Sequence, residues 1–365
     1  MESNKVLKIK KKPFITSECW SFYRLAILQT SIYADAWLSS HMDIFFIENQ
    51  FCAVFGDYSG RNYGIDYFND ILKYEKIEMK NYSYIEFCNM LFCEINSNNY
   101  VVLDLDFSYL SCDREDKFKL HENLIYGYDK QKEIFYSFTL KSNGEFVDVE
   151  LGFDEVYKSY NSICRYYRDV ENGRQRIDRM YNNYGITRIK ICETYDDTKD
   201  SHLFIEKIKR ELNGSFVVKK YYTLDKDNIL EEVDNGIYTG TACLMGLKKK
   251  MKQIANVGLD KTIDLKHYIN SLKKLDEHRK ILLNSMNWFY NKNALNYPER
   301  NHLKTIINEY EQCTEKFEKL RIELMKIGLK NEWIKVNEYL SQIDEIFIME
   351  QQILGSVVRE SYNIL

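Results

Sequence analysis

Cys19 is the residue whose surroundings most favour covalent chemistry. It stands in TSECWSFYRLAIL, residues 16–28, where a small polar cluster precedes an apolar run with helical spacing. Ser17 is well placed as the N-cap of that helix. The N–H groups and partial positive charge of a helix N-terminus favour a thiolate and can hold an oxyanion. The pattern therefore predicts a nucleophile, although among nine cysteines a structural thiol is the commoner case.

His121 is the second chemically suggestive residue. It begins HENLIYGYD, residues 121–129, a stretch whose alternation predicts a strand. A histidine on a strand projects toward whatever helix packs on the sheet, and a cysteine far upstream of such a histidine is a recurring order in thiol enzymes. Considered by itself, His121 is equally well read as a surface or hydrogen-bonded core residue. Together with Cys19 it predicts a cysteine–histidine pair.

The elements expected to position this pair are a helix followed by an antiparallel sheet, so the predicted fold class is α+β. The helix follows Cys19, and β-like runs cover residues 100–107, 121–129 and 133–140. Further along, strands are predicted at 145–151 and 186–195 and helices at 153–170 and 201–212, whereas 239–254 stays open between helix and strand.

The C-terminal part reads as entirely helical. Apolar positions fall on one helical face over residues 265–289, again over 303–324, and again over 333–347. Short joints between long helices predict antiparallel packing as a bundle.

Composition limits the possible partners and compartments. The chain has 51 basic and 55 acidic residues, a balance that argues against nucleic acid as a partner. Its apolar runs are too short to cross a bilayer, and the basic start lacks the apolar core of a signal peptide. Nine scattered cysteines are typical of free thiols in a reducing compartment, and their spacing predicts no metal site. We therefore expect a soluble cytoplasmic protein.

Three motifs in order carry a family resemblance. ECWSFYRLAIL, VVLDLDFSYLS and HENLIYGYDKQKEIFYS together resemble the peptidase C39-like papain-fold family typified by butirosin biosynthesis protein H, over most of residues 10 to 160. DLKHYINSLKKLDEHRKILLNSM is similar to the helical C-terminal part of those proteins. The resemblance extends to the amide-forming acyltransferases of closthioamide-type thiotemplated biosynthesis.

The resemblance implies a papain-like catalytic core at 1–160, a mixed segment at 161–261 that completes or covers it, and a helical region at 262–365. Members of the family take an acyl group from a carrier-protein thioester onto a cysteine and pass it to an amine, which forms an amide. The implied partners are therefore a phosphopantetheinyl carrier protein and a small amine acceptor, with no cofactor or metal.

Carried over residue by residue, the resemblance makes Cys19 the nucleophile and His121 the general base. The family's usual aspartate on the next strand is replaced here by Ser137, so Asp106 is expected to orient the imidazole in preference to Asp104 or Ser137. The usual glutamine before the cysteine is absent, which leaves the oxyanion to backbone N–H groups. A peptidase or thioester hydrolase of the same fold, and a non-catalytic binding relative, are the alternative functions.

Overall fold

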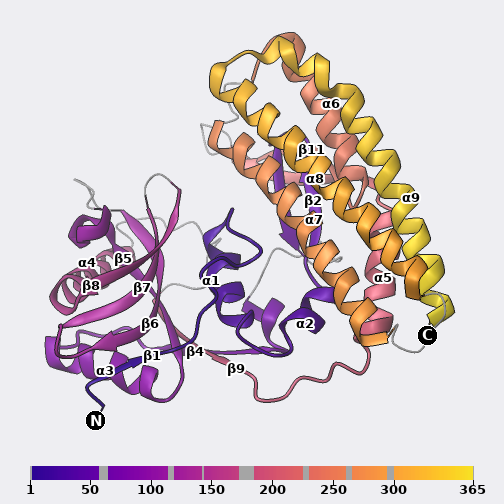
Figure 1. Ribbon diagram of the computed structural model, residues 1–365. Helices are drawn as coiled ribbons and strands as arrows, with labels where there is room; N and C mark the ends of the chain where they lie inside the picture. Colours follow the sequence, from indigo (N-terminus) through magenta and orange to yellow (C-terminus); the bar gives the residue numbers. More distant parts are fainter. Residues whose placement is uncertain are drawn as a thin grey trace. The chain divides into compact units, whose positions relative to one another are not determined.

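The computed structural model describes residues 2–56, 65–113, 119–141, 144–171, 185–224, 230–259, 265–293 and 300–364. Within these ranges it combines helices with antiparallel sheets, which confirms the predicted mixture of the two. The chain divides into two units, each built from two stretches (Figure 1). Unit 1 comprises Met1–Ala34 and Ile65–Tyr195, and unit 2 comprises Asp35–Gly64 and Asp196–Leu365.

Unit 1 is organised around one antiparallel sheet. The strand order is β4-β9-β5-β6-β7-β8, and β1 pairs with β6 outside that path. The bounds are β1 Asn4–Val6, β4 Leu72–Ile77, β5 Tyr100–Asp106, β6 Leu120–Asp129, β7 Ile134–Leu140, β8 Phe146–Gly152 and β9 Ile186–Ile191. The three runs predicted at 100–107, 121–129 and 133–140 are thus neighbouring strands.

Helices cover both faces of this sheet. The helices are α1 Cys19–Leu28, α3 Tyr84–Asn96 and α4 Phe153–Glu171, with 3-10 turns η1 Ile65–Phe68, η2 Phe107–Tyr109 and η3 Ser111–Asp113. Apolar residues of α3 and α4 form one buried cluster with β5, β6 and β7. On the other face Phe22 of α1 stacks on Phe146 at 3.8 Å and meets Phe138 edge-on at 5.3 Å. Helix α1 therefore lies on the sheet face opposite to α3 and α4, as Figure 1 shows.

The predicted cap of α1 is wrong. Glu18, not Ser17, is the N-cap, with extended backbone angles of φ −147° and ψ 139°. Its side chain caps no backbone N–H and instead accepts a short hydrogen bond from the Ser21 hydroxyl. Helix α3 has the capping box that α1 lacks, because Ser83 and Glu86 satisfy each other's backbone N–H groups.

Unit 2 joins a four-stranded antiparallel sheet to long helices. The sheet order is β10-β11-β2-β3, with β2 Asp43–Ile47, β3 Cys52–Gly56, β10 Phe216–Leu224 and β11 Leu230–Thr239. The helices are α2 Ala34–Ser40, α5 Asp200–Leu212, α6 Ala242–Val257, α7 Leu265–Asn293, α8 Arg300–Lys330 and α9 Leu340–Ile364, with a 3-10 segment η5 Trp333–Tyr339. Helix α7 packs on α8, and α8, α5 and α6 pack on α9.

The helices α7, α8 and α9 lie where the three apolar faces predicted them, with one correction. The third face begins at Trp333, but residues up to Tyr339 form 3-10 turns, and α9 starts only at Leu340. The open stretch 239–254 contributes mostly to α6. None of the helices in the described ranges combines the length and apolar character needed to span a membrane.

The predicted segments 1–160, 161–261 and 262–365 are consecutive, whereas the two observed units are not. The physical reason is the hairpin β2–β3. Strand β2 pairs with β11, which lies near residue 237, and this pairing draws an early part of the chain into unit 2. Local periodicity carries no information about which distant strand will be the partner.

Candidate functional site

Helix α1 begins at Cys19, the predicted nucleophile, whose side chain lies outside the described part of the structure. The first intrahelical bond runs from the Phe22 N–H to the Glu18 carbonyl at 3.1 Å. In such a helix the N–H groups of the first turn have no acceptor within the helix and carry the positive end of its dipole. The backbone at Cys19 thus has the arrangement that favours a thiolate.

His121 lies in β6, directly opposite Leu105 of β5, with its ring edge-on to Phe107 at 5.9 Å. Its Nδ1 is 2.9 Å from the carbonyl oxygen of Glu122. A carbonyl oxygen can only accept a hydrogen bond, so Nδ1 carries the hydrogen. In the neutral imidazole Nε2 then holds the lone pair, which is the form that a general base requires.

Tyr23 of α1 reaches the same carbonyl. Its hydroxyl donates to the Glu122 oxygen at 2.7 Å, and Arg24, only 1% exposed, lies 3.5 Å from the Glu122 carboxylate. The Glu122 side chain meets α1 through Arg24, and the Glu122 carbonyl accepts from both Tyr23 of α1 and the ring of His121. The Glu122 carbonyl is therefore where α1 and the imidazole meet.

Asp106 does not orient His121, which corrects the sequence prediction. Its buried carboxylate accepts four hydrogen bonds, from Ser108 N (3.1 Å), Ser108 Oγ (2.9 Å), Lys119 N (3.3 Å) and Ser162 Oγ (2.6 Å), and none comes from the imidazole. In the register of β5 and β6, Asp106 pairs with Leu120, and Leu105 pairs with His121. The carboxylate instead closes the connection between β5 and β6 and fastens it to α4.

The two alternative orienting groups also lie elsewhere. Asp104 pairs with Glu122, and its carboxylate accepts the Gly185 N–H at 3.0 Å. Ser137 pairs with Ile125, four residues along β6 from His121, which corresponds to about 13 Å of strand. The orienting group that sequence reasoning missed is the Glu122 backbone carbonyl, and a main-chain oxygen has no sequence signature.

The glycine of the YGYD stretch has a structural explanation. A Cβ at Gly127 would lie 2.9 Å from the Lys5 carbonyl oxygen and 3.0 Å from the Val6 Cα. Strand β1 pairs there with β6, next to a register shift between Ile125 and Gly127. Gly127 is therefore needed for the close approach of β1 to β6, which gives this glycine a structural role and not a catalytic one.

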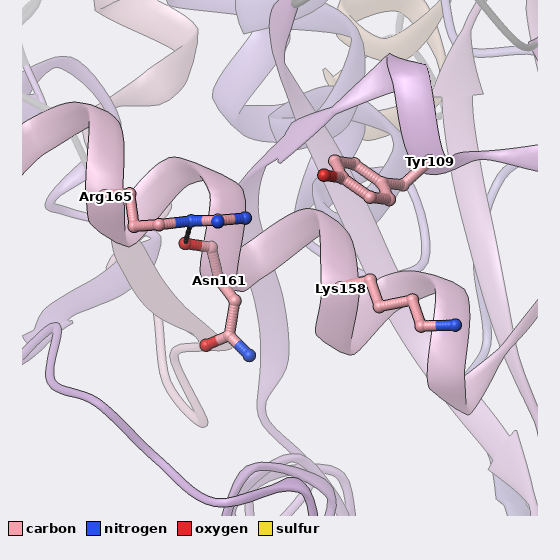
Figure 2. A pocket seen from close by; sticks show the side chains of 4 residues that line it. All are labelled: Tyr109, Lys158, Asn161 and Arg165. Atoms are coloured by element: carbon pink, nitrogen blue, oxygen red, sulfur yellow. Dashed lines mark hydrogen bonds between the residues drawn. The ribbon is translucent and has the colours of Figure 1, made fainter.

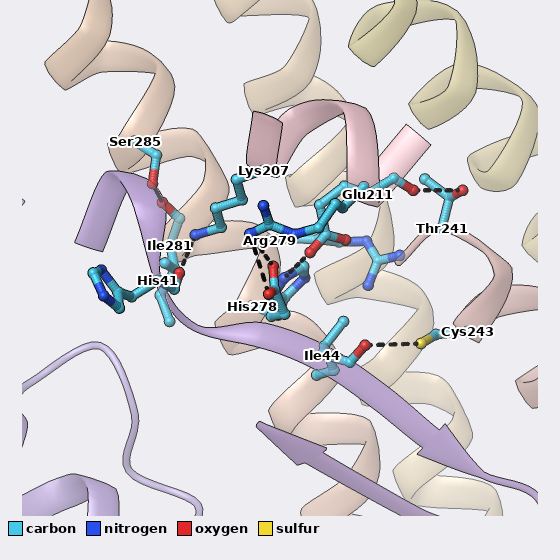
Figure 3. Close-up of polar contacts among 12 residues, drawn as sticks. His41, Ile44, Lys207, Glu211, Thr241, Cys243, His278, Arg279, Ile281 and Ser285 are labelled. Carbon is cyan, nitrogen blue, oxygen red and sulfur yellow. Dashed lines mark hydrogen bonds and ion pairs between the residues drawn. The ribbon is translucent and has the colours of Figure 1, made fainter. Parts of the chain in front are cut away.

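Unit 2 holds a second group of ionisable residues, in a buried polar cluster (Figure 3). Lys207 of α5 donates to the carbonyls of Leu38, at 3.0 Å, and of His41, and burial lowers the pKa of its ammonium to about 8. Glu211, one turn further along α5, lies 3.1 Å from His278 of α7. These bonds fix the segment before β2 to α5, and α5 to α7. Nothing in the sequence pattern singles these residues out.

The surroundings of Cys243, in the same region, make its thiol unreactive. Its thiol lies 3.2 Å from the Tyr238 carbonyl, and burial raises its pKa well above the ordinary value. Burial also raises the pKa of Cys88 to about 11 and that of Cys313 to about 12. Such thiols stay protonated at neutral pH and are poor nucleophiles.

No family model matches the chain, and a search of curated proteins found no relative. Among the described residues, no group of three or more His, Cys, Asp or Glu side chains is arranged to hold a metal ion.

Proposed function

We propose that this protein is a cysteine acyltransferase with a papain-like catalytic core and a C-terminal helical bundle, working in the cytoplasm in thiotemplated, nonribosomal biosynthesis. Its acyl donor is a thioester on a carrier protein, and its acceptor is the amine of a small molecule. Cys19 is the nucleophile and His121 the base. The orienting group is the Glu122 carbonyl in place of Asp106.

The observation that supports this proposal is the shared Glu122 carbonyl. It leaves Nε2 of His121 as the basic nitrogen, and through Tyr23 it connects His121 to the helix that Cys19 begins. A carbonyl acceptor fixes the tautomer and orientation of an imidazole without adding a negative charge. The base would therefore be weaker than one paired with a carboxylate. Such a base suits a thiol, which is far more acidic than the hydroxyl of a serine or threonine nucleophile.

In the first half-reaction Nε2 of His121 takes the thiol proton of Cys19, and the thiolate attacks the thioester carbonyl. The carrier thiol leaves with that proton, and the acyl group stays on Cys19. In the second half-reaction an amine attacks, gives its proton to Nε2, and leaves as amide, while the Cys19 sulfur recovers the proton. The first-turn N–H groups of α1 would stabilise both oxyanions.

Intact-mass spectrometry tests the proposal directly. The protein is incubated with a benzoyl thioester of a small thiol, and then with benzylamine. We expect an adduct of one benzoyl mass that the amine discharges as N-benzylbenzamide, and no adduct in Cys19→Ala. Cys93→Ala is the matched control, because Cys93 is an exposed thiol of the same unit. Discharge to benzoate at one rate with or without amine would instead identify a hydrolase.

A further inference from the structure

A pocket of about 450 Å³ lies in unit 1 between η2 and α4. It is lined by Tyr109, Lys158, Asn161 and Arg165 (Figure 2). The last three recur at helical spacing on one side of α4, and Tyr109 faces them from η2. Its volume is within the range of small-ligand sites, which are typically about 300–1,000 Å³. The polar lining carries two cations, an amide and a phenol.

The two walls of the pocket are fastened to each other. The Ser162 hydroxyl of α4 donates to the Asp106 carboxylate at 2.6 Å. The neighbouring Ser159 hydroxyl lies 2.6 Å from the Asp106 N and 3.0 Å from its carbonyl oxygen. Asp106 is also the N-cap of η2, which carries Tyr109. The buried bonds of Asp106 therefore hold the lining residues at a fixed spacing before any ligand arrives.

The charged groups of the lining are available to a ligand. Lys158 is 58% exposed and its partner Asp154 is 67% exposed, at 2.6 Å. Exposed pairs of this kind add little to stability, so an anion can replace Asp154 at little cost. Arg165 contacts the Asn161 carbonyl through Nε at 3.4 Å, which leaves the terminal nitrogens of its planar fork for an oxyanion.

We propose that this pocket binds a phosphate monoester of a small organic molecule. The phosphate accepts from Arg165, Lys158 and the Asn161 amide, and the organic group lies on the Tyr109 ring. The three terminal oxygens of a phosphate monoester accept hydrogen bonds from donors in several directions, whereas a planar carboxylate has only two oxygens. The doubly charged ester also matches two cations. His121 is not among the described residues that line the pocket, and the test of the pocket does not depend on acyl transfer.

Isothermal titration calorimetry at low salt tests the site with four probes: phenyl phosphate, inorganic phosphate, benzoate and phenol. We expect saturable binding of phenyl phosphate, at least tenfold weaker binding of inorganic phosphate and benzoate, and none of phenol. Arg165→Gln should weaken phenyl phosphate tenfold or more, and Lys158→Gln about threefold to tenfold. Tyr109→Leu should weaken phenyl phosphate but leave inorganic phosphate unchanged.

The controls are exposed cations of helices in unit 2. Lys326 forms an exposed pair with Glu323 at 2.7 Å, as Lys158 does with Asp154, and Arg359 is an exposed arginine of α9. Lys326→Gln and Arg359→Gln should bind phenyl phosphate as the unchanged protein does. The proposal is overturned if no phosphate probe saturates, if benzoate binds as tightly as phenyl phosphate, or if the control variants lose as much affinity as Arg165→Gln.

Discussion

Tyr23 and His121 donate to the same atom, the carbonyl oxygen of Glu122, at 2.7 Å and 2.9 Å. One residue comes from the helix that Cys19 begins and the other from the central strand β6. A single main-chain oxygen thus sets the position of α1 and the tautomer of the imidazole together.

Tyr23→Phe removes one of the two donors and leaves the fold intact. We expect the acyl-transfer kcat to fall about threefold to tenfold with KM unchanged, because the imidazole loses part of its positioning, and stability to fall by about 1 kcal/mol. Tyr160→Phe is the matched control, since the Tyr160 hydroxyl donates to the Lys80 carbonyl at 2.8 Å. It should lose similar stability in urea and no activity. Equal kinetic losses in the two variants would contradict a positioning role for Tyr23.

Asp106→Asn separates support of the fold from catalysis. The amide presents an N–H₂ group where the carboxylate accepts four hydrogen bonds, so urea unfolding should show a loss of about 2–4 kcal/mol. Acyl transfer by the folded fraction should stay within about threefold, and Ser137→Ala should change neither quantity. The rate of acyl transfer by His121→Asn should fall at least about a hundredfold. A hundredfold loss in Asp106→Asn at unchanged stability would restore the aspartate as the orienting group.

Sequence reasoning succeeded where the pattern is local. The apolar spacing after Cys19 located α1, and alternation located the strand of His121, because both signals repeat within a few residues. The third group was mispredicted, because strand register decides whether Asp106 or Leu105 lies opposite His121. One position of register reverses the face on which a side chain emerges. The hairpin β2–β3 was missed for a related reason, since its partner β11 lies far along the chain.

The position of Cys19 predicts selective alkylation at neutral pH. With limiting iodoacetamide at pH 7, Cys19 should react faster than the exposed Cys93, because the helix N-terminus and His121 favour its thiolate. Cys243 should remain unmodified in the folded protein, because burial raises the pKa of its thiol. Peptide mapping gives the individual rates.

His121→Asn provides the internal comparison for that experiment. It should slow Cys19 alkylation and leave Cys93 alkylation unchanged, since in the proposed mechanism His121 is the base for Cys19 alone. If Cys19 reacts no faster than Cys93 in the unchanged protein, its thiolate is not stabilised and the nucleophile assignment fails.

Gly127→Ala tests the structural role of the YGYD glycine. The added methyl meets main-chain atoms of β1 at 2.9 Å and 3.0 Å, and backbone cannot move aside cheaply. We expect a loss of about 1–3 kcal/mol, typical of overpacking, with faster hydrogen exchange in β1. Gly355→Ala in α9 is the control, because a Cβ there meets nothing within 4 Å. Helix propensity predicts a gain of up to about 1 kcal/mol for that variant. Unchanged stability of Gly127→Ala would mean that β1 does not hold this position.

Lys207→Met tests the buried cluster of unit 2 through pH. Burial lowers the pKa of Lys207 to about 8 from 10.5. Between these values the unfolded chain binds the proton that the folded protein has lost, so the Lys207 contribution to the unfolding free energy rises with pH. Between pH 8 and pH 10.5 this contribution to the unfolding free energy grows by about 3 kcal/mol. Buried thiols act in the opposite direction above their ordinary pKa, but they are common to both proteins and cancel in the difference.

The unfolding free energy of the unchanged protein minus that of Lys207→Met should therefore increase by up to about 3 kcal/mol from pH 7.5 to pH 10.5, measured by urea titration at each pH. At pH 7.5 two opposing effects set the difference in unfolding free energy between the two proteins. Methionine relieves a buried charge, but it also removes the Lys207 hydrogen bonds to the Leu38 and His41 carbonyls. Lys326→Met, at an exposed lysine, should give a curve parallel to the unchanged protein. A difference for Lys207→Met that stays constant over the same range would mean that Lys207 keeps its charge in the folded protein, held by Asp43 and Glu211.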